Sequence, residues 1–113
     1  MKHLLTSVVL VVLLFPSLAM GEEVTFADLV ERDGLYYKKV TEVPFTGKVT
    51  GLQQGRFKNG VMEGPWVSYH ENGQLWNKGT YKNGEREGPW IDYDKNGTVH
   101  ENLTGTYKNG VKQ

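Results

Sequence analysis

Short runs of alternating apolar and polar residues make up most of the chain, and turn-forming residues separate these runs. An alternation of period two is typical of β-strands that bury one face. It predicts strands at residues 55–58, 66–70, 74–82, 90–93 and 98–108, arranged as an antiparallel meander of hairpins. One helical pattern lies at 25–31, where Thr25 and Asp28 occupy capping-box positions beside an apolar side. The predicted fold is therefore mainly β, with a short N-terminal helix.

A repeat dominates the second half of the chain. The segment from Gly55 to Gly73 recurs without a gap from Gly79 to Gly97, and a third copy begins at Gly105. The copies start 24 and then 26 residues apart, which defines units at 55–78 and 79–104 and a partial unit at 105–113. Because side chains alternate with period two, the even insertion leaves every later residue on its original face. The repeat predicts stacked units that cover one another's apolar surface.

Each complete unit carries two Asn-Gly pairs and one Gly-Pro-Trp sequence. Asn-Gly is typical of a type I′ hairpin turn, in which both central residues have positive φ. Proline cannot donate to a strand ladder, so Gly-Pro predicts a bend or the start of a strand. The two tryptophans stand at the same phase of each unit, as packing between units requires. The predicted structural residues of the repeat are Gly60, Gly64, Trp66, Gly73, Gly84, Gly88, Trp90 and Gly97.

The first 21 residues have the order of a secretory signal peptide. Lys2 supplies a positive start, an apolar run follows from Leu4 to Phe15, and small residues end at Gly21. The run is shorter than the roughly 20 residues that span a bilayer. We therefore expect cleavage, after Gly21 or after Ala19, and export to the periplasm or outside the cell, with membrane contact only during export. Residues 22–54 would hold the helix and a degenerate capping repeat.

Composition excludes several kinds of site. The chain has no cysteine, so it can form neither a disulfide nor a thiolate metal site. Its formal net charge is zero, and the lysines are spread among glutamates and aspartates, which argues against a nucleic-acid-binding face.

No catalytic constellation is visible either. Beyond the signal region the histidines are His70 and His100, which flank turns and have no second ligand type at a useful spacing. Ser68 lacks the glycine-flanked elbow of a serine nucleophile. We therefore predict no catalytic, cofactor-binding or metal-binding residue and a protein that is not an enzyme.

The repeated pattern G-x-[YF]-K-N-G-x-x-x-G-P-W-x-x-Y-x-x-N-G resembles the MORN-variant repeat of bacteria, found in proteins of the YwqK-type antitoxin family. The resemblance covers 55–113 well and Gly34 to Lys48 weakly. It implies a sheet of repeats used for attachment to proteins or membranes rather than for catalysis, and a toxin as the partner. An antidote to an intracellular toxin would stay in the cytoplasm, so export is reconciled with this resemblance by an envelope or immunity role.

We therefore expect a protein-interaction module that binds a toxin or an envelope protein. The candidate partner-binding residues are Trp76, Tyr69, Tyr93 and His100. An alternative is a cell-envelope glycan- or choline-binding repeat protein, because stacked hairpins can form aromatic cages. Trp76 is replaced by His100 in the next unit, so a cage cannot recur at every repeat, and this favours a protein partner.

Overall fold

The computed structural model describes residues 22–113, and the predicted signal peptide lies outside the described residues. The strands are β1 (Glu22–Thr25), β2 (Leu29–Arg32), β3 (Leu35–Lys38), β4 (Gly47–Thr50), β5 (Gln53–Lys58), β6 (Val61–Met62), β7 (Gly64–Tyr69), β8 (Leu75–Lys82), β9 (Glu85–Arg86), β10 (Gly88–Asp92), β11 (Gly105–Lys108) and β12 (Val111–Lys112). The prediction of a mainly β fold is confirmed.

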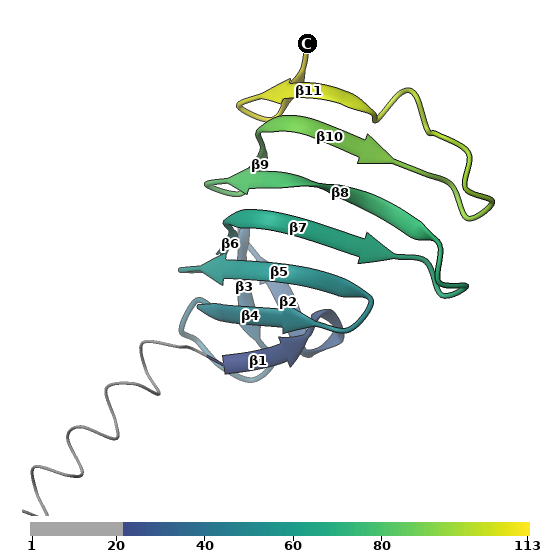
Figure 1. Cartoon of the computed structure of the whole chain (residues 1–113). Coiled ribbons are helices and arrows are strands. Elements are labelled where there is room, and N and C mark those ends of the chain that lie inside the picture. Colours follow the sequence, from purple (N-terminus) through teal and green to yellow (C-terminus); the bar gives the residue numbers. More distant parts are fainter. Residues whose placement is uncertain (1–21) are drawn as a thin grey trace, which may run out of the picture.

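One long sheet runs in the order β1-β4-β5-β7-β8-β10-β11-β12, with β6 paired to β5 and β9 paired to β8. From β4 onward every pairing is antiparallel, so the predicted meander is confirmed. Strand β1 differs, because it pairs with β4 in parallel. Strands β2 and β3 form a separate hairpin behind the first strands of the long sheet (Figure 1). The hairpin therefore covers one face of the sheet at its N-terminal end.

The predicted helix at 25–31 is wrong. The capping box does form, since the Thr25 backbone N–H and hydroxyl each donate to Asp28 Oδ2 at 3.0 Å, and these bonds lower the pKa of Asp28 below 3.8. It caps only a three-residue 3-10 turn, Phe26–Asp28. The following residues enter β2, which pairs with β3 through a turn at Asp33 and Gly34, both at positive φ. A helix this short is marginal in water, whereas the hairpin satisfies the backbone and buries Leu29.

The two Asn-Gly pairs of a unit form different turns. The four glycines expected at positive φ have it: Gly60, Gly73, Gly84 and Gly97. Asn59 and Asn83 share that conformation, as a type I′ turn requires, but Asn72 and Asn96 do not. At the second pair, Gly73 N donates to His70 O at 2.9 Å, which closes a turn that ends in a left-handed glycine. The type I′ prediction is therefore correct for the first pair of each unit and wrong for the second.

The Gly-Pro sequences mark bends, as predicted. Gly64 and Gly88 have φ of 95° and 82° and begin β7 and β10 directly after β6 and β9. The predicted strand at 98–108 is mostly wrong, because only Gly105–Lys108 is a strand. The residues before it form a loop that is joined to the sheet by a single bridge between Tyr93 and Val99. This loop absorbs the two extra residues of the second unit.

Aromatic rings form the core along one face of the sheet, which we call the core face and define by Phe57, Trp66, Tyr81, Trp90 and Tyr107. Successive centroids are 6.3 Å apart for Phe57 and Trp66, 5.8 Å for Trp66 and Tyr81, and 5.2 Å for Tyr81 and Trp90. All three pairs meet edge to face, a favourable arrangement for the ring quadrupoles. Residues of the N-terminal segment extend this row: Phe26, Tyr36 and Phe45.

Each buried tryptophan lies between two glycines of neighbouring strands. Trp66 is paired with Gly79 on β8 and lies against Gly55 on β5. Trp90 is paired with Gly105 on β11 and lies against Gly79. The glycines that open the repeat copies therefore leave room for the indole rings, and each ring joins two units.

Candidate binding face

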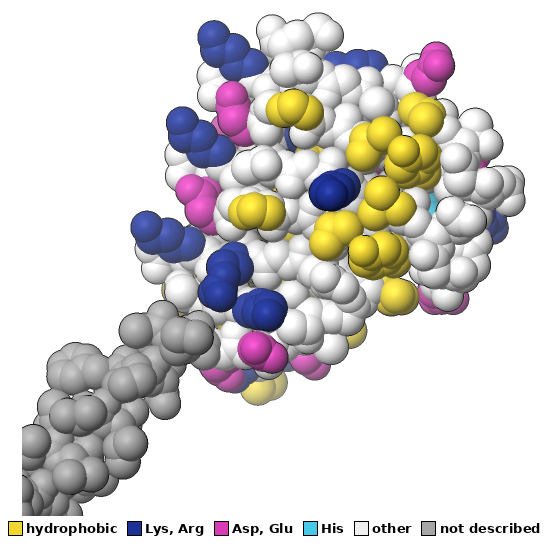
Figure 2. Space-filling model, viewed as in Figure 1, with side chains coloured by type: hydrophobic (Ala, Val, Ile, Leu, Met, Phe, Trp, Pro, Cys, Tyr) yellow, Lys and Arg dark blue, Asp and Glu magenta, His cyan; other side chains and the backbone are white. Residues whose placement is uncertain are grey.

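The opposite face of the sheet carries a second apolar group. Alternation along the strands places five side chains there: Val67 and Tyr69 from β7, Trp76 from β8, Ile91 from β10, and Tyr93 directly after β10. We call this the open face. Trp76 is 38% exposed and the other four are half-buried. Figure 2 shows apolar side chains gathered over β7, β8 and β10 on this face.

A β-bulge sets the position of Trp76. Ser68 pairs with Asn77 and Tyr69 pairs with Leu75, so Trp76 is the extra residue in the ladder. Bulges are known to redirect side chains at functional surfaces. The imidazole of His70 stacks on the Trp76 ring, with centroids 5.2 Å apart and planes inclined by 26°. The Trp76 ring is therefore supported on one side by the His70 imidazole.

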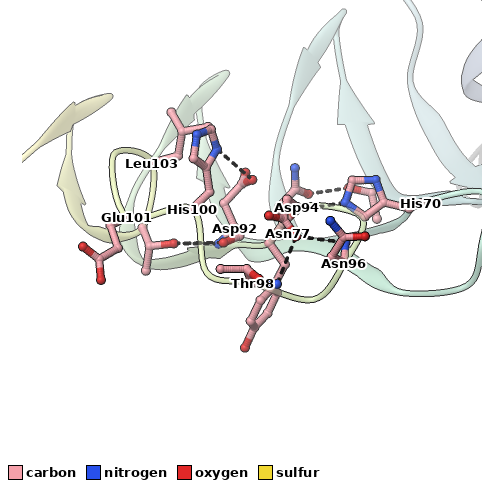
Figure 3. A network of polar contacts seen from close by, with 12 residues as sticks. His70, Asn77, Asp92, Asp94, Asn96, Thr98, His100, Glu101 and Leu103 are labelled. Atoms are coloured by element: carbon pink, nitrogen blue, oxygen red, sulfur yellow. Dashed lines mark hydrogen bonds and ion pairs between the residues drawn. The ribbon is translucent and has the colours of Figure 1, made fainter.

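His70 is itself held by the next unit. Its Nε2 lies 2.9 Å from the backbone oxygen of Tyr93, a contact that Figure 3 shows beside the turn of the second unit. Tyr93 N donates in turn to the backbone oxygen of Trp76 at 2.7 Å. These bonds link His70, Trp76 and Tyr93 across the two units. A surface ordered in this way loses little conformational entropy on binding.

His100 is not part of this group. Its Nδ1 lies 3.8 Å from Oδ1 of Asp92, whose side chain is buried on the core side. Its backbone N–H donates to the backbone oxygen of Asp92 at 2.7 Å. The structure therefore brings together three of the four predicted partner-binding residues and places His100 in the loop that borders the core face.

Three buried polar residues continue the core face beyond the tryptophans: Ser68, Asn77 and Asp92 (Figure 3). The Ser68 hydroxyl donates to Oδ1 of Asn77. Thr104 Oγ1 accepts from the Asp92 backbone N–H at 2.9 Å and donates to the Asp92 oxygen at 3.2 Å. Sequence reasoning missed this ladder. Its signal was available, since Ser68 and Asp92 each stand two residues after a core tryptophan.

Between residues 22 and 113 no group of three or more His, Cys, Asp or Glu side chains is placed to hold a metal ion. Within that same range no helix is long and apolar enough to cross a membrane. The Ser68 hydroxyl is buried against an amide, without a base beside it. The open face offers a ligand an accessible apolar surface.

Comparison with known families gives one match. The family model described as MORN repeat variant matches residues 62–83, which run from β6 through the first turn after β8. The match includes Trp66, Trp76 and the glycine on which Trp90 lies. No curated protein and no solved structure shows significant similarity to the chain. The segment is thus a MORN repeat variant, and the identical spacing at Gly79 to Gly97 extends the pattern along the sheet.

Proposed function

We propose that the protein is an exported, non-enzymatic interaction module whose open face binds another protein. One observation carries this proposal: the described sheet presents Tyr69, Trp76 and Tyr93 together on an accessible face, with the Trp76 ring fixed by His70. Tryptophan and tyrosine dominate the binding energy of protein interfaces. The MORN repeat variant at 62–83 supports a repeat protein with a binding role.

The antitoxin or immunity role is a narrower form of the same proposal. It comes from the resemblance of the repeat to YwqK-type proteins, and it names a toxin as the partner. Export favours a partner in the envelope or outside the cell. In that setting the protein would block a toxin after secretion or anchor it to an envelope protein.

The glycan- or choline-binding alternative has weaker support. An aromatic cage needs several exposed rings around one site, but Trp66 and Trp90 are only 5% and 3% exposed. Among the described tryptophans, Trp76 alone presents its ring to solvent, and it stacks on an imidazole. A protein partner, which can contact a broad and slightly curved face, suits this arrangement better.

Site-specific photocrosslinking tests the proposal. A benzophenone amino acid placed at Tyr69 should form a covalent adduct with a protein in cells of the source organism. The matched control carries the same crosslinker at Val43, an exposed apolar residue in the connection before β4, away from the open face. Adducts that form from Tyr69 and not from Val43 would support binding of a protein at the open face. The same adducts from both positions, or adducts with glycan only, would contradict it.

A further inference from the structure

Three cationic side chains border the apolar group of the open face. Lys48 on β4, Arg56 on β5 and Lys78 on β8 line a shallow hollow of about 350 Å³ that also includes Pro65 and Val67. Lys78 is paired with Val67 on one side and with Ile91 on the other. The cations and the aromatic group therefore form one continuous surface, and Figure 2 shows basic side chains beside and within the apolar area.

These three charges have no anionic partner among residues 22–113. The ion pairs within 4.0 Å in that range are Lys38 with Glu22 and His100 with Asp92. The nearest acidic position on the open face is Glu23, in register with Lys48, but its carboxylate lies farther than 4.0 Å from that amine. Among the open-face residues of β4, β5, β7, β8 and β10, none is acidic.

Acidic residues that follow the strands are engaged elsewhere. Glu63 accepts from the backbone N–H of Asn83 at 2.6 Å, and Glu87 accepts from that of Asn109 at 2.9 Å. Each carboxylate thus stabilises the turn of the next unit. The sequence mixes acidic and basic residues, but the fold places these two carboxylates at the turns and the three cations of the hollow on the strands.

Lys48 and Arg56 also stand directly opposite each other on β4 and β5. Like charges at directly opposed positions destabilise a sheet. No described carboxylate lies within 4.0 Å of either charge. An anionic group bound between them would offset this repulsion, and the apolar area beside them would be covered by the same ligand.

The geometry points to an acidic protein segment as the partner of the open face, with Asp or Glu side chains next to a large apolar residue. This inference rests on the proposed function and specifies the chemistry of its partner. Its carboxylates would lie over Lys48, Arg56 and Lys78, and its apolar residue over Trp76. A polyanion without apolar groups would leave the aromatic area in water, so a protein segment fits both parts of the surface.

Selection of short random peptides displayed on phage tests this inference with the full chain as bait. Peptides bound by the wild type should be enriched in Asp and Glu together with Trp, Phe or Leu. The affinity of a selected synthetic peptide should fall as salt is raised, because exposed charges are screened. Replacing the three cations of the hollow (K48Q, R56Q and K78Q), which gives the open-face triple variant, should abolish the acidic enrichment and weaken the binding of that peptide about tenfold. Because R56Q removes a repulsion, it should not lower the melting temperature.

The matched control removes three cations that lie outside the open face, on the N-terminal hairpin and on the core side of β12: K38Q, K39Q and K112Q. It changes the net charge equally and should leave the affinity for the selected peptide unchanged. The inference would be overturned if the selected peptides contained acidic residues only at the library frequency, or if both triple variants lost peptide affinity equally. Tighter binding of phosphatidylglycerol vesicles or RNA than of any peptide would also overturn it.

The variant W76A separates the two proposals. If W76A weakens peptide binding and the open-face triple variant does not, the open face is still the binding face, but the proposal of an acidic partner is wrong. If neither W76A nor the open-face triple variant affects binding, both proposals fail.

Discussion

Trp90 lies so close to Gly79 that a Cβ atom on Gly79 would be 2.2 Å from Cε3 of the indole ring. The same distance separates a Cβ on Gly55 from Trp66. Neither glycine has the positive φ that would by itself require glycine. The requirement is therefore steric, and it comes from the tryptophan on the neighbouring strand.

We predict that Gly79→Ala destabilises the protein by about 1–3 kcal/mol, the usual range for an overpacked core. In a Trp90→Ala background the same change should cost much less, because the ring that it meets is gone. Urea unfolding of the wild type, both single variants and the double variant gives the coupling free energy. Additive effects within about 0.5 kcal/mol would show that the contact does not exist in solution.

Trp90→Ala by itself should lower the free energy of unfolding by about 3–5 kcal/mol. The Trp90 Nε1 is buried without a hydrogen-bond partner in the described structure, so the loss comes from packing. Trp76→Ala should cost less stability, since that ring is 38% exposed. Chemical denaturation of both variants shows which substitution lowers the free energy of unfolding more. Equal losses would make Trp76 a packing residue and remove the main support for the binding face.

Gly84→Val should destabilise the protein by about 1–3 kcal/mol, because a β-branched residue is strained at the φ of 83° found there. Gly84→Asn is the matched variant, since asparagine tolerates this conformation and should cost clearly less. Thermal melts compare the two. A valine variant that melts like the parent would contradict the turn at Asn83 and Gly84.

The capping box at Thr25 predicts a pH dependence. Its hydrogen bonds, first to the backbone and then to the side chain of Thr25, hold the pKa of Asp28 below 3.8. A lowered pKa means that the stabilisation is present above that value and is lost as the pH falls through the lowered pKa. Asp28→Asn should therefore melt below the wild type at neutral pH, and the gap should narrow well below pH 3.8. A gap that stays constant with pH would exclude this role of the carboxylate.

Export predicts a shortened chain. Intact-mass measurement of protein recovered from outside the cytoplasm should show a start at Met20 or Glu22, as cleavage after Ala19 or Gly21 requires. A full-length product confined to the cytoplasm would contradict both the signal peptide and the proposed setting.

The repeat and its turns were predictable because their signals are local. Each Asn-Gly pair marks a turn within about four residues. The spacing of the copies and the matching positions of Trp66 and Trp90 can be counted directly along the sequence. The helix prediction failed at Leu29 because strand pairing with Lys38 outweighed a weak local pattern. The parallel addition of β1 to β4 depends on a contact that no local signal encodes.

The candidate face was only partly predictable. Both faces of β7 carry large apolar residues, so alternation alone could not show which one the N-terminal hairpin covers. The grouping of Lys48, Arg56 and Lys78 on one face could be found only from the strand register, because Lys78 is far from the other two in the sequence and acidic residues lie between it and Arg56. His100 was predicted to bind a partner because it occupies the position of Trp76 in the next unit. The loop that holds the two-residue insertion places His100 away from the open face, so the two residues are not structurally equivalent.

The Trp-on-Gly contact also has a genetic consequence. Each unit places its opening glycine opposite the tryptophan of the unit before it and its own tryptophan opposite the opening glycine of the unit after it. A tandem duplication of one unit would therefore create both halves of a new joint at once. Adjacent strands are about 4.8 Å apart, so one extra unit of two long strands would widen the sheet by about 10 Å without altering existing contacts. Copy number could therefore drift between lineages, and the area offered to a partner would change in fixed steps.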